Sequence, residues 1–248
     1  TNLAASAVLD GDEWVINGAK QFITNSGTDI SGCVSITAVT GEDERGRAEI
    51  SNFIVPNGTP GYTVEKPYRK MGWNASDTHP LSFDDVRLPQ SAMLGPRGHG
   101  FKQFLQILDG GRIGVAAMSV GVAQGALDEA IKYAKERQAF GQSISKFQSI
   151  QAKIADISSA LEAARLLTYK AAIMKDRGED FSLTAAQAKL ITGRLAVRAT
   201  EEAVQIHGGY GFIEEYPVSR FYRDAKILTI GEGTDEVQQM VIARALGC

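Results

Sequence analysis

The sequence is poor in cysteine, in basic charge and in long apolar runs, and each scarcity narrows the class of protein. Two cysteines among 248 residues are too few for a disulfide scaffold, and a chain of this length buries a sizeable core without one. Cys33 and Cys248 show no metal-ligand spacing, so no metal site is expected and the two thiols indicate a reducing compartment. Any redox chemistry would therefore require a bound cofactor.

Charge and hydropathy argue against two kinds of partner. The chain has 26 Lys and Arg against 29 Asp and Glu, a net charge of -3, and no run of basic residues that could neutralise a nucleic-acid backbone. Its longest apolar stretch, residues 113–123, is interrupted by glycine and serine and is shorter than the roughly 20 residues needed to cross a bilayer. The sequence predicts a soluble protein that binds neither nucleic acid nor membrane.

The first hundred residues have the composition of an antiparallel β domain. Six of the 7 prolines lie there, between short runs rich in β-branched residues. Turn signals at residues 10–12 and at Asn17-Gly18 predict two hairpins, which would join residues 3–9, 13–16 and 19–23. Further strands are expected at residues 33–39, 50–55 and 81–86. We expect this domain, residues 1–92, to be barrel-like.

The rest of the chain, residues 93–248, has a helical period. Between Phe147 and Ala164 apolar residues recur at intervals of three and four, which predicts a long helix closed by Gly178. Two more long helices are expected at residues 101–137 and 183–206, and a shorter one begins at Thr234 as its N-cap. The sequence therefore predicts an α+β protein that ends in an up-down four-helix bundle.

Three glycine-rich places in the helical half leave two interpretations open. Gly110 and Gly111, directly after Asp109, each cost about 1 kcal/mol of helix stability relative to alanine. This cost indicates either a close helix crossing or space for a ligand beside Arg112. The segment of residues 207–211 is either a plain turn or a close approach of backbone to a cofactor. Glu232, between two glycines, is either a solvated loop carboxylate or a general base in a dry cavity.

An ordered set of short motifs runs along the whole chain. They are residues 14–18 with Lys20, residues 22–25, Met71-Gly72 with residues 76–78, residues 83–86 with Pro89, Gly100-Phe101, Arg112, Gly121 with Ala123-Gln124, Glu136-Arg137 with Phe140-Gly141, Gln148, Gln151, Gln205 with Gly208-Gly209 and Gly211, Tyr216-Pro217, residues 223–226, and Glu232-Gly233-Thr234. Together they resemble the acyl-CoA dehydrogenase family.

The resemblance implies an FAD-dependent enzyme of fatty acid β-oxidation that converts an acyl-CoA thioester to the trans-2-enoyl-CoA. Its electrons would pass to an electron-transfer flavoprotein, and it would be a homotetramer, a dimer of dimers, in bacterial cytoplasm or the mitochondrial matrix. The family also has a helical domain that would precede Thr1. Two alternatives remain: a flavin monooxygenase or nitroalkane oxidase on the same scaffold, against which Glu232 argues, and a non-catalytic acyl-CoA-binding or assembly subunit.

The resemblance also implies residue roles. Glu232 would remove the α-proton while the β-hydrogen leaves as hydride to flavin N5. Asp109 and Arg112 would contact the pantetheine arm of the substrate or support the base, which Gly231 and Gly233 flank. The implied cofactor contacts are Thr24 to flavin N5, Phe22 beside the isoalloxazine ring, Arg137, Phe140 and Gln148 to the FAD of a neighbouring subunit, Gln205, Gly208 and Gly209 to its adenosine and pyrophosphate, and Thr234 to the cofactor near the base.

Two glycines bear on the substrate. Gly231 stands where many relatives carry a bulky aromatic residue, and Gly111 offers no side chain opposite. We therefore hypothesise a pocket widened near the thioester, which suits short or branched acyl groups.

Overall fold

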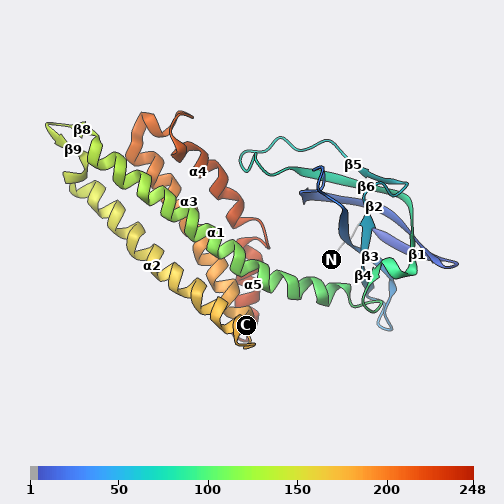
Figure 1. Ribbon diagram of the computed structural model, residues 1–248. Coiled ribbons are helices and arrows are strands. Elements are labelled where there is room, and N and C mark those ends of the chain that lie inside the picture. Colours follow the sequence, from blue (N-terminus) through green and yellow to red (C-terminus); the bar gives the residue numbers. More distant parts are fainter. Residues whose placement is uncertain (1–4) are drawn as a thin grey trace. The chain divides into compact units, whose positions relative to one another are not determined.

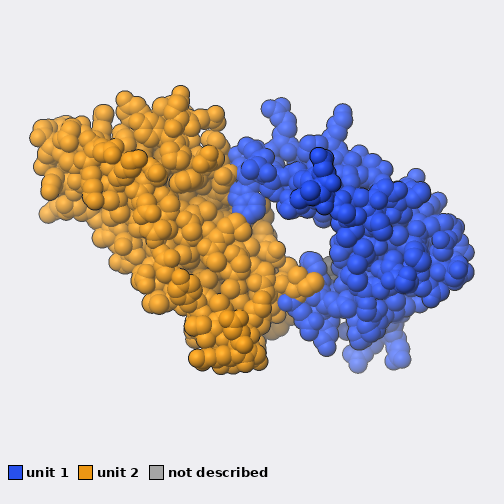
Figure 2. Space-filling model, in the orientation of Figure 1, with its two compact units in different colours: residues 1–106 blue, residues 107–248 orange. Residues whose placement is uncertain are grey.

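The computed structural model describes residues 5–248, and they form two compact units (Figures 1 and 2). The first unit extends to Gln106 and the second begins at Ile107, so the division lies inside helix α1 (Gly100–Glu136). The domain boundary expected between residues 92 and 93 remains a proposal from the sequence.

Over its described residues, the first unit is built on one mixed sheet of seven strands, which are β1 (Ser6–Asp10), β2 (Glu13–Thr24), β3 (Cys33–Glu42), β4 (Ala48–Pro56), β5 (Tyr62–Val64), β6 (Thr78–Pro89) and β7 (Met93–Leu94). Their order across the sheet is β5-β6-β2-β1-β3-β4-β7. Trp14 and Ile16 alternate with less buried residues along β2, and Phe53 of β4 meets the Trp14 ring edge-on at a centroid distance of 5.3 Å. This period of two places one face of the sheet in the core.

The first expected hairpin is confirmed for the described residues, since β1 pairs antiparallel with β2, while residues 3–4 of its expected first strand lie outside them. The second expected hairpin is wrong. Strand β2 continues through Asn17-Gly18 as a bulge in its pairing with β6, and Gly18 takes up the distortion at φ 130°. The Asn17 amide exchanges two hydrogen bonds with Asp85, at 2.9 and 2.8 Å, which holds the bulge in the sheet.

The extended β2 also changes the topology. Because the chain does not reverse at Asn17, it returns on the other side of β1, and β3 runs parallel to β1 where Ser6 pairs with Val39. The sheet order runs from β5 to β7 without closing, so the expected antiparallel, barrel-like arrangement is corrected to an open mixed sheet. The α+β class itself is confirmed.

The second unit is helical, and the four expected helices are present. Thr234 caps the last of them as predicted, because its hydroxyl accepts a hydrogen bond from the Val237 amide at 3.4 Å. The unit also contains α4, which begins at Pro217 and was not expected. The helices after α1 are α2 (Gln148–Asp176), α3 (Ser182–His207), α4 (Pro217–Ala225) and α5 (Asp235–Ala245).

Helix α3 lies at the centre of this unit, where it packs against α2, α4 and α5 (Figure 1). Its buried face consists largely of small residues, which allow neighbouring backbone to approach closely. At Gly193 a Cβ atom would lie only 2.6 Å from the Leu228 carbonyl oxygen. This contact fixes the short 3-10 helix Lys226–Thr229 against α3 and thereby positions the loop that follows it.

Candidate functional site

Glu232 lies in the loop between that 3-10 helix and α5, in an unusual backbone conformation. Its φ is 54° and that of Gly233 is 87°, so two consecutive residues are left-handed. A residue with a side chain occupies this region only when its surroundings hold it there. Glu232 itself is exposed at the surface of the second unit.

The Glu232 carboxylate lies directly against Gly111 of α1. A Cβ atom added to Gly111 would stand 2.9 Å from Oε2 and 3.1 Å from Cδ of that carboxyl group. Gly231 leaves further space, because its added Cβ would first meet the Ile227 carbonyl oxygen at 3.5 Å. The room left by the missing side chain at residue 111 is therefore taken by the carboxylate of Glu232.

An ion pair lies beside Gly111 on the same helix. The Arg112 guanidinium, only 3% exposed, donates to Asp109, and the Ser182 hydroxyl donates to the same carboxylate oxygen at 3.0 Å. The Nε atom of Arg112 is buried and has no hydrogen-bond partner among residues 5–248. A buried, rigidly held cation thus stands one residue from the contact with Glu232.

Two buried residues that are absent from the predicted site, Lys189 and Gln238, hold the Glu232 loop. Lys189 of α3 donates from Nζ to the Gly233 carbonyl at 2.7 Å, and Gln238 of α5 donates to the Glu232 and Gly233 carbonyls at 3.1 and 3.0 Å. Burial lowers the pKa of Lys189, an effect opposed by the nearby Asp235 carboxylate.

A sequence signal for Lys189 does exist. Lys189 lies four residues after Ala185 and three before Thr192, on a helix face otherwise made of small and apolar residues. A lone lysine in that register indicates a buried charge with a specific partner.

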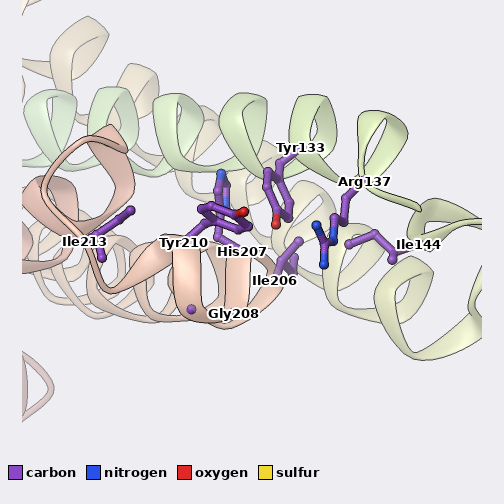
Figure 3. Close-up of a pocket in the computed structure, with 9 residues that line it drawn as sticks. Tyr133, Arg137, Ile144, Ile206, His207, Gly208, Tyr210 and Ile213 are labelled. Atoms are coloured by element: carbon purple, nitrogen blue, oxygen red, sulfur yellow. The ribbon is translucent and has the colours of Figure 1, made fainter. Parts of the chain in front are cut away.

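A pocket of about 590 Å³, whose lining does not include Glu232, opens where α1 and α3 end (Figure 3). Tyr133 and Arg137 project into it from the end of α1, toward Ile206 and His207 at the end of α3. The remaining lining residues are Ile144, Gly208, Gly209, Tyr210 and Ile213.

The pocket combines aromatic faces, a cation and bare backbone. The His207 ring stacks on Tyr133 at 4.2 Å, and burial lowers the pKa of this histidine. The Arg137 guanidinium lies 5.8 Å from the Tyr210 ring centroid. Gly208, at φ 58°, ends α3, and apart from its chain neighbours no heavy atom of the described residues lies within 4 Å of a Cβ added at Gly208 or Gly209.

The other predicted contacts of this region lie outside the pocket lining. Phe140 forms the tip of the short hairpin of β8 (Gln138–Ala139) and β9 (Gln142–Ser143), at φ 49° and 96% exposed. Gln148 is the first residue of α2 and Gln205 lies near the end of α3, and both are exposed. An almost fully exposed phenylalanine on a left-handed turn is typical of a contact surface rather than of a core.

Phe22 and Thr24 end strand β2 in the first unit. Phe22 is left-handed at φ 60° and 72% exposed, and its ring lies 5.2 Å from that of Tyr68. Thr24 pairs with Thr78 of β6 and is exposed. The sheet therefore presents an aromatic ring and a hydroxyl together at this strand end.

Comparison with known proteins assigns both units. Residues 1–86 match the family model for the acyl-CoA dehydrogenase middle domain, and residues 98–247 match that for the acyl-CoA dehydrogenase C-terminal domain. The chain belongs to the acyl-CoA dehydrogenase family.

Individual acyl-CoA dehydrogenases align along almost the whole chain. A Bacillus subtilis protein named as a probable acyl-CoA dehydrogenase is 51% identical over 240 residues, which cover 97% of this chain and 63% of the relative. The solved structure of butyryl-CoA dehydrogenase from Megasphaera elsdenii superposes with a TM-score of 0.93 at 48% identity, over 98% of this chain and 63% of that one.

A chain in a structure of the electron transferring flavoprotein of Acidaminococcus fermentans, concerned with flavin-based electron bifurcation, gives a TM-score of 0.92 at 45% identity, over 99% of this chain and 64% of that one. The present chain thus spans somewhat over three fifths of the length of each of these three proteins. In its described part, no helix is long and apolar enough to cross a membrane, and no cluster of His, Cys, Asp and Glu could hold a metal ion.

Proposed function

We propose that this chain carries the catalytic base and part of the cofactor site of an FAD-dependent acyl-CoA dehydrogenase. The reaction is the oxidation of a short-chain acyl-CoA thioester to the trans-2-enoyl-CoA, a step of fatty acid β-oxidation. The observation that supports it most directly is the Glu232 carboxylate, held on a left-handed loop against a glycine of α1.

The base of this reaction is Glu232. Its carboxylate accepts the proton from the carbon next to the thioester carbonyl, and the new O–H bond forms at a carboxylate oxygen. Arg112 and Asp109 stand at the same turn of α1, and the burial of Arg112 favours their role as supports of the base over a contact with the pantetheine arm. Gly231 and Gly233 keep bulky side chains away from the carboxylate on its own loop.

The pocket at the end of α1 and α3 fits the pyrophosphate and adenosine of FAD. Its volume lies in the range of cofactor sites, Arg137 supplies a fixed cation for phosphate, and bare backbone at Gly208 and Gly209 allows close approach. Phe140 and Gln148 would meet the cofactor of a neighbouring subunit, and Gln205 its adenosine. Thr24, Phe22 and Thr234 would contact the flavin end. When bound at these residues, FAD would supply the two-electron acceptor for the hydride of the β-carbon.

Substrate and partners are inferred from the relatives. Butyryl-CoA dehydrogenase, at 48% identity, supports a short acyl chain, as does the space at Gly231. The relative associated with an electron transferring flavoprotein supports such a flavoprotein as electron acceptor. A homotetramer, arranged as a dimer of dimers, would bring Arg137 and Phe140 to a neighbouring cofactor.

The test is Glu232→Gln in the holoenzyme. This change keeps the size of the side chain but removes the basic lone pair, so flavin reduction by butyryl-CoA should slow by about 10²–10⁴-fold or more while FAD and acyl-CoA still bind. The control is Glu179→Gln, a surface carboxylate 50% exposed beside Arg177, which should leave the rate unchanged. A wild-type rate in Glu232→Gln would exclude this residue as the base. A wild-type protein without flavin absorbance would favour a non-catalytic subunit.

A further inference from the structure

The loop of the base is left-handed at two consecutive residues, and its position depends on what holds it. Glu232 and Gly233 have φ values of 54° and 87°, and Glu232 is exposed. Neither exposure nor backbone preference favours this conformation for a glutamate. Some neighbouring group must therefore stabilise the loop if the carboxylate is to stay against Gly111.

Two buried side chains converge on the carbonyl oxygens of this loop. Gln238 Nε2 donates to both the Glu232 and the Gly233 carbonyl, and Lys189 Nζ donates to the Gly233 carbonyl as a second donor. Both side chains are fully buried, at 0% exposure, and they come from different helices, α3 and α5. An added Cβ at Gly233 would lie 2.8 Å from the Gln238 amide nitrogen, so the loop is packed directly on this donor.

The charge of Lys189 is held where burial opposes it. Its ammonium group lies 4.0 Å from Asp235 and is attracted by Glu232 and Glu236 and repelled by Arg112. If a buried lysine only filled space, an apolar side chain of similar length could replace it at little cost in the free energy of unfolding. The hydrogen bond to Gly233, at 2.7 Å, gives the ammonium a specific partner in the loop of the base.

We propose that Lys189 and Gln238 are positioning residues for Glu232. Gln238 binds the carbonyls of both left-handed residues and Lys189 binds that of Gly233, and together they keep the carboxylate against Gly111. This inference rests on the proposed function, in which Glu232 is the base.

The test uses the holoenzyme and butyryl-CoA in protiated and α-deuterated forms. Lys189→Met keeps the length of the side chain but removes the charge and the donors, and Gln238→Met removes the other donor. Displacement of the base should lower the limiting rate of flavin reduction by about 10–100-fold. It should also raise the deuterium isotope effect, while the acyl-CoA dissociation constant changes by less than about threefold. Flavin absorbance per subunit should remain at the wild-type value.

Thr200→Val is the matched control for stability. Thr200 lies on the same helix at 0% exposure, and among residues 5–248 its hydroxyl bonds only to α3 carbonyls, those of Ala196 and Val197. This variant should change the melting temperature but neither the rate nor the isotope effect. If Lys189→Met does not fold, the rate and isotope effect of Gln238→Met decide whether the donors to the loop carbonyls position Glu232.

A double variant separates this inference from the proposed function. Lys189→Met combined with Glu232→Gln should be no slower than Glu232→Gln alone, because Lys189 acts through Glu232. If Glu232→Gln is slow but Lys189→Met and Gln238→Met both have wild-type rates and isotope effects, the positioning role is wrong and the proposed base is retained. A wild-type rate in Glu232→Gln would overturn the proposed base, and the positioning role with it.

Discussion

Gly111→Ala should make the protein more stable and less active at once. The added Cβ would stand 3.1 Å from the Glu232 carboxyl carbon, whereas carbon atoms in contact lie about 3.5–4.0 Å apart. The carboxyl group must therefore move by roughly 0.4 Å or more, and a misplacement of that size slows a positioned reaction on the order of tenfold. Because Gly111 is inside α1, alanine should meanwhile stabilise the helix by up to about 1 kcal/mol.

Stopped-flow reduction of the flavin by butyryl-CoA and thermal unfolding of the same sample measure the two effects. The melting temperature should rise by about 2–4 °C while the limiting rate falls. Gly114→Ala is the control, since no described atom beyond the adjacent backbone of α1 lies within 4 Å of its added Cβ, and it should raise the melting temperature without slowing the reaction. A wild-type rate in Gly111→Ala would refute the contact between the base and α1.

Three further predictions concern the cofactor pocket, the substrate and pH. Arg137→Ala should weaken FAD binding roughly 10- to 100-fold, the loss expected for one charge-assisted bond to phosphate, and should lower the mass of the oligomer on dilution. Light scattering measures the mass of the oligomer, and flavin absorbance measures the FAD content. The control, Arg45→Ala on a surface turn of the first unit, should change neither quantity. Unchanged mass and flavin content in Arg137→Ala would contradict the cross-subunit contact. The ratio kcat/KM should be higher for butyryl-, isobutyryl- and 2-methylbutyryl-CoA than for octanoyl-CoA, and a preference for octanoyl-CoA would exclude a pocket suited to short chains. Burial lowers the pKa of His207, so the unfolded chain binds more protons than the folded one just below the ordinary value near 6.5. The free energy of unfolding should therefore fall as pH drops through about 6.5 in urea titrations, and the same pH dependence in His207→Gln would show that another group is responsible.

The helices were predictable because their signals are local. The apolar period of three and four residues located α2, and the hydroxyl and acidic residues at its start located α5 with its N-cap. Helix α4 was missed because its nine residues are too short for a periodic pattern and its only start signal is Pro217. The Asn17-Gly18 prediction failed because the same dipeptide fits either a hairpin turn or a bulge, and only the partner strand β6 decides between them.

By itself, the sequence determined the α+β class, the long helices, and Glu232 between two glycines as the candidate base. These features depend on residue types within a few positions of one another and on an ordered set of motifs along the chain. Only the tertiary structure decided that the carboxylate lies against Gly111, more than a hundred residues earlier, and that Lys189 and Gln238 hold its loop. The contacts of Glu232 with Gly111 and of Gly233 with Lys189 join elements that are distant in the chain, and they are set by how α1 and α3 pack, which no local pattern specifies. Gln238, five and six residues beyond Gly233 and Glu232, reaches the loop from the first turn of α5.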